Sequence, residues 1–106
     1  MPLTEQEFRL KSDEALDQLR RALMPLADQE GFEIELNAGV LNLLFEEPSE
    51  TRFVVSPNAP VRQIWVSAMA RGYKLPWSDE THAFVLDGES LAAFVERLAR
   101  EFLASA

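Results

Sequence analysis

An alternating stretch at residues 61–67 places the tightest limit on how this chain can fold. It reads Val-Arg-Gln-Ile-Trp-Val-Ser, so a strand here would place Ile64 and Val66 on one face and Gln63 and Trp65 on the other. The apolar pair needs a core, and a one-residue slip of register would expose it. In a sheet covered by helices on one side only, the opposite face stays open. Trp65 is therefore predicted to be exposed, where a partner could reach it.

The length and charge of the chain limit its architecture and its partners. A chain of 106 residues with 47% hydrophobic content fits one domain with one core, over residues 1–106. Eighteen acidic residues against ten basic ones give a net charge of −8, which repels phosphate backbones and anionic lipids. We therefore expect neither nucleic acid nor a membrane surface as a partner, and favour cations and basic protein surfaces.

The reactive residue types are few. The chain has no cysteine and one histidine, so a metal would be held by oxygen ligands or by that histidine. His82 is more typical of a surface or edge position than of a ligand, because no second histidine exists. The usual pairings of nucleophile and base are missing, so an enzyme is not expected. No apolar or Arg-rich leader begins the sequence and no apolar run approaches the roughly 20 residues that span a bilayer, so we expect a cytoplasmic protein.

Two amphipathic helices are predicted, one at each end of the chain. Thr4 and Glu7 have the spacing of a capping box, so the first helix begins there. Pro25 lacks an N–H group and should end or kink this helix near Met24. Ser90 is the expected cap of the second helix. The predicted apolar stripes consist of Phe8, Ser12, Ala15, Leu16, Leu19, Ala22, Leu23 and Leu26 in the first helix, and of Leu91, Phe94, Val95, Leu98 and Phe102 in the second.

About six strands are predicted between the helices. They are expected at residues 32–37, 41–45, 51–55, 61–67, 73–75 and 82–86, with turns at 37–39, 56–60, 76–79 and 87–88. In the first strand Phe32, Ile34 and Leu36 should face inward. Connections this short favour antiparallel pairing, and two helices of this length cover one face of such a sheet. The predicted fold is an α+β two-layer sandwich, with two helices on one face of a roughly six-stranded antiparallel sheet.

Three short motifs resemble the frataxin family, including its bacterial members called CyaY. They are Asn37-x-Gly39-Val40-Leu41, Pro60-x-x-Gln63-Ile64-Trp65 and Asp87-Gly88-x-Ser90-Leu91. The second is fairly specific, and the match runs in order along nearly the whole chain. The resemblance implies weak binding of ferrous and ferric iron. It also implies a role in iron-sulfur cluster assembly, as iron donor to, or regulator of, the complex of the cysteine desulfurase and its scaffold protein.

The resemblance also implies where the sites lie. In that family an acidic ridge along the first helix and first strand binds iron, and the open sheet face with its exposed Trp meets the assembly machinery. The implied metal ligands are Asp13, Glu14, Asp17, Asp28, Glu30, Glu33 and Glu35. The implied partner-binding residues are Asn58, Gln63 and Trp65.

The chain departs from the family pattern in ways that leave alternatives open. Arg20 and Arg21 lie at positions where bacterial members have several carboxylates, so this chain has fewer candidate metal ligands there. The eukaryotic pattern has Asn and Gln where this chain has Ser56 and Asn58. One alternative is a protein-interaction module of the same fold that has lost useful iron binding, its acidic helix face being simply solvated. Ferroxidase activity is known for some members, but no dinuclear motif supports it here. We expect a monomer, and the sequence leaves open whether it activates or inhibits the desulfurase.

Overall fold

The computed structural model describes residues 3–105, which form two α-helices, one short 3-10 helix and seven strands. The elements are α1 (Glu5–Glu30), β1 (Glu33–Asn37), β2 (Val40–Phe45), β3 (Thr51–Asn58), η1 (Ala59–Val61), β4 (Gln63–Ala68), β5 (Arg71–Ser78), β6 (Ala83–Leu86), β7 (Glu89–Ser90) and α2 (Leu91–Leu103). Residues 1, 2 and 106 belong to the expected single domain but lie outside the described residues. The domain count stays a prediction.

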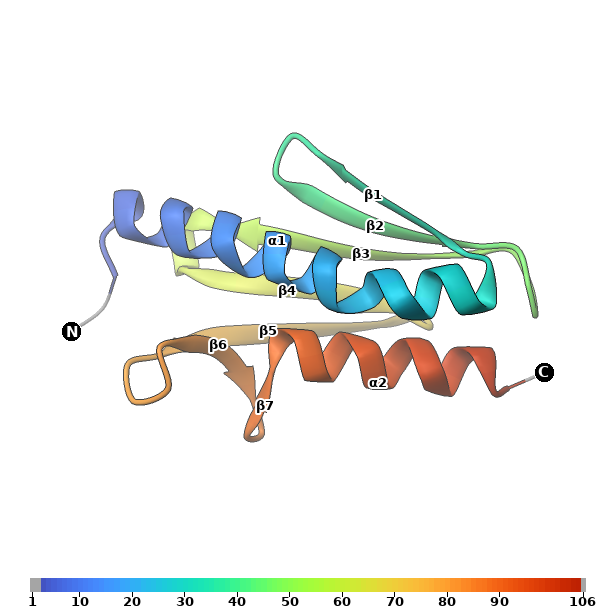
Figure 1. Ribbon diagram of the computed structural model, residues 1–106. Helices are drawn as coiled ribbons and strands as arrows, with labels where there is room; N and C mark the ends of the chain where they lie inside the picture. Colours follow the sequence, from blue (N-terminus) through green and yellow to red (C-terminus); the bar gives the residue numbers. More distant parts are fainter. Residues whose placement is uncertain (1–2, 106) are drawn as a thin grey trace.

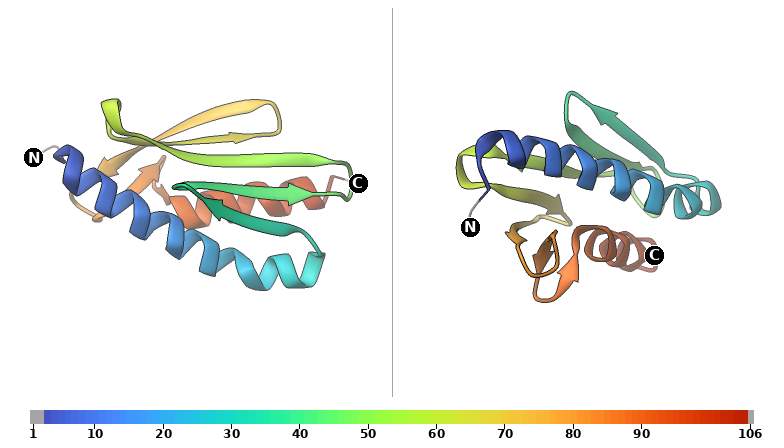
Figure 2. Two further views of the ribbon diagram at one scale, coloured as in Figure 1. Left: turned by 90° about the horizontal axis from the view of Figure 1, so that it is seen from above. Right: turned by 60° about the vertical axis from the view of Figure 1, so that its left-hand side comes forward.

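The strands follow one another across the sheet in chain order, and every neighbouring pair is antiparallel. Both helices pack side by side against one face of this sheet, while the other face carries no helix (Figures 1 and 2). The predicted α+β sandwich is confirmed. The strand count is seven, because a two-residue strand at Glu89–Ser90 pairs with β6 directly before α2.

Helix α1 begins as predicted but continues past its proline. Thr4 and Glu7 form a reciprocal capping box, with both hydrogen bonds in place at 3.0 and 3.1 Å. The prediction that the helix stops or kinks near Met24 is wrong. Pro25 lies on the exposed side, where water can reach the carbonyl it leaves unpaired, while Leu26 and Ala27 behind it are buried. Burial of those two side chains therefore carries the helix on to Gly31, whose φ of 81° suits glycine at a helix end.

The core lies between the sheet and the helices, and aromatic side chains fill one end of it. Phe45 contacts Phe32, Phe53 and Phe102, with ring centroids 4.6, 4.9 and 4.8 Å apart. These rings join β2, β3 and α2, and all four are at least nine-tenths buried. Because aromatic rings carry large apolar areas, this cluster fixes the sheet against the second helix.

Two predicted turns are strand instead, and both contain proline. Residues 56–58 extend β3, so Pro57 pairs with Ile64 of β4. It lies beyond Val55, the last β3 residue that pairs with β2, so its missing N–H faces no partner strand there. Pro76 belongs to β5 at the point where the strand changes partner, since it pairs with Gln63 of β4 while the next residue pairs with β6. Proline is tolerated at both strand edges.

The prediction that Leu36 faces the core is also wrong. Its side chain is 38% exposed, although it shares the helix-facing side of β1 with half-buried Ile34. The tip of the β1–β2 hairpin rises away from α1 (Figure 1), and Leu36 is the second-last residue of β1 before that tip. Ala22, expected in the apolar stripe of α1, is likewise exposed. Within residues 3–105, neither helix has the length and apolar character needed to cross a bilayer.

Candidate functional site

The centre of the open sheet face is the middle of β4. Ile64, Val66 and Ala68 are almost completely buried, so Gln63, Trp65 and Ser67 point to the opposite, helix-free side. The register sets their neighbours: Gln63 lies opposite Asn58 of β3, and Trp65 lies between Ser56 of β3 and Lys74 of β5. The three partner-binding residues predicted from the sequence therefore lie together on two adjacent strands.

The Trp65 side chain is exposed but held in place. Its indole is 37% exposed, which confirms the prediction from the alternation. The indole Nε1 donates a hydrogen bond to Gln63 Oε1 at 3.0 Å. The Lys74 ammonium sits over the ring, 5.2 Å from the centroid, within the range of a cation–π interaction. An exposed aromatic fixed from two sides loses little conformational freedom on binding, which suits a contact residue.

Arg62, which sequence reasoning missed, positions the start of β4. It adopts a left-handed backbone conformation with φ 54°, which is uncommon for a residue with a side chain. Its Nε donates to the Leu3 carbonyl at 3.2 Å, and its guanidinium also donates to the Ala59 carbonyl. The side chain thus ties the 3-10 turn before Gln63 to the segment before α1. No local pattern marks this role, because the two partners lie 59 and 3 residues away.

The predicted acidic residues of α1 are partly neutralised. Asp17 forms ion pairs with Arg20 and with Arg21, each at 3.0 Å, and Glu14 lies 3.7 Å from Lys11. Arg21 lies four residues after Asp17, a spacing that places the two side chains side by side on a helix, and Arg20 adds a second cation to the same carboxylate. Exposed pairs of this kind contribute little stability. They do place positive charge directly at the surface where the sequence predicted metal ligands.

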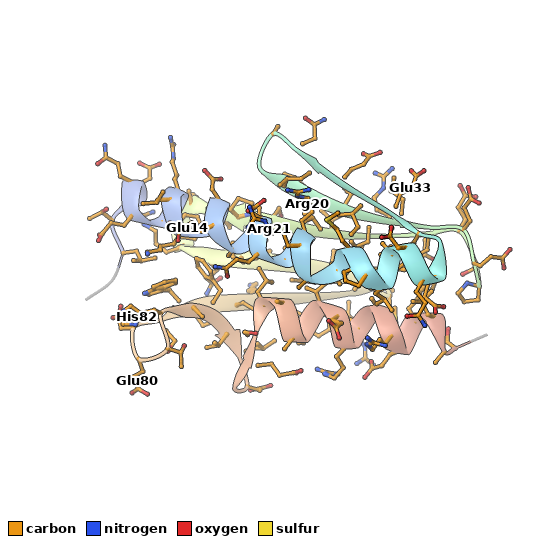
Figure 3. All side chains as sticks on the ribbon, viewed as in Figure 1. Glu14, Arg20, Arg21, Glu33, Glu80 and His82 are labelled. Carbon is orange, nitrogen blue, oxygen red and sulfur yellow. The ribbon has the colours of Figure 1, made fainter. Side chains whose placement is uncertain are left out.

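Glu33 and Glu35 lie on the other side of the sheet from α1. Ile34 pairs with buried Leu43, whereas Glu33 and Glu35 pair with Leu44 and Asn42, whose side chains alternate away from the core. The β1 carboxylates therefore belong to the helix-free face. Figure 3 shows Glu14 beside the first half of α1 and Glu33 toward its far end, with Arg20 and Arg21 between them. The structure does not bring the predicted helix and strand ligands together.

The predicted metal ligands accordingly form no closed cage. Across residues 3–105, no three His, Cys, Asp or Glu side chains lie close enough to hold one metal ion. Asp28 and Glu30 are exposed at the C-terminal end of α1, where the helix dipole is itself negative. This surface can attract a cation through the summed negative potential of separated carboxylates. A cation held in this way keeps most of its bound water.

One group of carboxylates was missed by the sequence analysis. Glu33, Glu46 and Glu50 line a shallow hollow of about 560 Å³ at the end of the sheet, together with Arg52. Two of these carboxylates, Glu46 and Glu50, lie in the loop between β2 and β3. The hairpin register could have indicated the grouping, because a strand that pairs Glu33 with Leu44 near the end of β2 brings the residues that follow β2 close to Glu33. This end of the sheet adds negative charge beyond the predicted ridge.

The perturbed carboxyl groups among the described residues lie outside the predicted sites. The backbone N–H of Thr4 lowers the pKa of Glu7, which belongs to the capping box. Hydrogen bonds from Arg97 lower the pKa of Glu89 and join β7 to α2. Both shifts have structural causes. His82 is exposed on the loop between β5 and β6 with Glu80, away from Arg20 and Arg21 (Figure 3), and its ring lies 6.4 Å from that of Trp77.

Comparisons with known proteins show which family the chain is similar to. Residues 1–105 match the family of frataxin-like domains. Three bacterial proteins named iron-sulfur cluster assembly protein CyaY are similar. The protein of Cupriavidus metallidurans is 38% identical, and the match covers 68% of this chain and 65% of the relative. The protein of Ralstonia nicotianae is 30% identical, and the match covers 91% of this chain and 85% of the relative. The protein of Pseudomonas fluorescens strain Pf-5 is also 30% identical, and the match covers 95% of this chain and 90% of the relative. The solved structure of a frataxin from Psychromonas ingrahamii shares the fold, with a TM-score of 0.65 at 20% identity over 97% of this chain and 92% of that one.

Proposed function

This chain belongs to the frataxin-like family, and we propose that it acts in iron-sulfur cluster assembly by docking to the cysteine desulfurase and its scaffold protein. Iron is the proposed cargo, bound weakly by the separated carboxylates. The proposed role is that of an adaptor in the bacterial cytoplasm rather than of an enzyme. The names of its relatives support the pathway.

The observation that carries the proposal is the clamped, exposed Trp65 at the centre of a helix-free sheet. The Trp65 side chain is only partly covered, its indole N–H is hydrogen-bonded to Gln63, and its ring lies under Lys74. Exposed apolar surface at such a position indicates a protein interaction site. Aromatic side chains of this kind are enriched among residues that dominate binding energy. Asn58 and Gln63 beside it supply amide groups for the polar part of the contact.

The test is the binding of Trp65→Ala to the purified desulfurase–scaffold complex. Truncating a central aromatic hot spot costs roughly 2 kcal/mol or more, which is about a 30-fold loss of affinity. Leu36→Ala is a matched control, because Leu36 is exposed to nearly the same degree, 38% against 37%, but lies outside this patch. Unchanged binding by a folded Trp65→Ala variant would show that the complex docks elsewhere.

One observation favours the alternative of an interaction module without useful iron affinity. Two arginines pair with Asp17, a carboxylate at the middle of the predicted ridge. An anaerobic ferrous titration followed by amide NMR separates the two functions. Iron binding predicts broadening of signals around the α1 and β1 carboxylates, whereas the module predicts no localised change while binding to the complex persists.

A further inference from the structure

A hollow of about 330 Å³ opens on the helix-free face directly beside Trp65. It lies over β3, β4 and β5, and its lining contains no carboxylate. The lining residues are Val54, Ser56, Trp65, Val66, Ser67, Gly72, Tyr73 and Lys74. The hollow is therefore a mainly apolar depression with one cation at its edge.

The sheet register produces the hollow by placing a row of small residues next to a row of large ones. Val54, Ser67 and Gly72 lie opposite one another across three strands. The adjacent row contains Trp65 and Lys74. Gly72 leaves open space at this point, because a Cβ built there would have no atom within 4 Å. The depression is a feature of the backbone pairing and does not depend on a mobile loop.

The charge at the rim is available to a partner. All the basic residues of the two helices are in ion pairs; these are Arg9, Lys11, Arg20, Arg21, Arg97 and Arg100. Lys74 makes no ion pair within residues 3–105, and its ammonium lies over the Trp65 ring. A cation against an aromatic face keeps donors directed to solvent, where a carboxylate can bind them. The chain as a whole has a net charge of −8, but the surface around Lys74 attracts a negatively charged group of a partner.

We infer that the hollow receives one apolar side chain from a partner protein, carried on a segment that also places a carboxylate on Lys74. The inference rests on the proposed docking of the open face and specifies the chemistry of what docks there. The apolar side chain packs on the indole and over Gly72, where it displaces water from a concave surface. A basic segment would meet the unpaired Lys74 with like charge, so the same site rejects it.

Two substitutions test the two halves of this inference against the purified desulfurase–scaffold complex. Gly72→Val fills the hollow. The variant is expected to fold, because a Cβ added at this position has no atom within 4 Å, φ lies outside the left-handed region, and valine is favoured in strands. Lys74→Glu reverses the rim charge. Each is expected to weaken binding about tenfold. Arg71→Glu is the matched control. Arg71 lies on the same strand and makes no ion pair within residues 3–105, but it pairs with buried Ala68 and so belongs to the helix-facing side.

The outcomes separate this inference from the proposed function. Weaker binding by both variants, with Arg71→Glu close to wild type, supports it. Wild-type binding by both, alongside weakened binding by Trp65→Ala, overturns the inference and leaves the docking surface standing. Tighter binding by Lys74→Glu shows that the docking segment is basic and also overturns it. No binding by the wild type overturns the inference together with the proposed function.

Discussion

The open face around Trp65 and the outer surface of α1 both carry exposed polar side chains, but they are ordered in different ways. On the open face each position is set by strand pairing, and Trp65 is held by a hydrogen bond and by a cation over its ring. On α1 the charged side chains are long, and their partners lie three or four residues along the same helix. The first surface is shaped before a partner arrives, and the second acts through its summed charge.

This difference indicates two modes of recognition in one small fold. A preorganised aromatic patch loses little entropy on binding, so it suits a specific protein contact. Separated carboxylates give a potential that is screened over about 10 Å at 0.1 M salt, so they suit a weak and poorly selective cation site. Four predictions test the contrast, ordered by the size of the expected effect.

Phe45→Ala should have the largest effect, on stability alone. Phe45 is 2% exposed and contacts three other rings, so its loss should reduce the free energy of unfolding by 3–5 kcal/mol, roughly the cost of removing a buried aromatic. Trp65→Ala should cost about 1 kcal/mol or less, because its ring packs against no core element. Urea denaturation of both variants compares them. Equal destabilisation would mean that Trp65 supports the core.

Gln63→Ala should free the indole of Trp65 without changing the fold. Loss of one hydrogen bond costs about 1 kcal/mol, so binding to the desulfurase–scaffold complex should weaken roughly fivefold. Gln63→Glu retains an acceptor for the indole N–H and should keep the ring in place. The indole N–H resonance of Trp65 reports this directly, and an unchanged resonance in Gln63→Ala would rule out a positioning role for Gln63.

The double variant Arg20→Glu and Arg21→Glu should strengthen weak ferrous iron binding about threefold at low salt, because it removes both cations from Asp17. The gain should shrink at moderate salt. Arg71→Glu with Lys74→Glu changes the net charge equally but on β5, a different element from the helix that carries Asp17. If the two double variants gain equally, the effect is one of total charge, and α1 has no special part in it.

The Glu89–Arg97 pair should give the smallest effect, seen as a pH dependence. Hydrogen bonds from Arg97 lower the pKa of Glu89 in the folded protein. The contribution of the pair to the free energy of unfolding is therefore present above the unfolded pKa of about 4.3. It is lost as the pH falls through the lower pKa of the folded protein. Wild type should have a slightly higher Tm than Arg97→Gln at pH 7, with the difference vanishing in acid. A difference that grows in acid would contradict this assignment.

The sequence predicted the fold class and the exposure of Trp65 because both depend on local periodicity. The alternation of residues 63–66 and the capping box of Thr4 and Glu7 leave few structural options. It failed at Pro25, Pro57 and Pro76, where proline was taken to break an element. In each case tertiary context decides: Pro25 faces water beside buried Leu26, and the two strand prolines lie where a neighbouring strand ends or changes.

The candidate site was predictable on the sheet and less so on the ridge. Strand register places Asn58 beside Gln63, so the motif residues lie together as expected. The face on which Glu33 and Glu35 lie follows from which side α1 covers, which is a long-range packing outcome. The hollow beside Trp65 needs the relative register of three strands, and no single segment encodes it.

The most direct test of the account is a pair of amide NMR titrations on the same labelled protein, one with the desulfurase–scaffold complex and one with ferrous iron. The account predicts two separate sets of residues. The complex should broaden signals of Gln63, Trp65, Ser67 and Lys74, and iron should broaden signals near the carboxylates of α1 and β1. A complex that perturbs the α1 carboxylates and leaves the Trp65 indole unchanged would contradict the account.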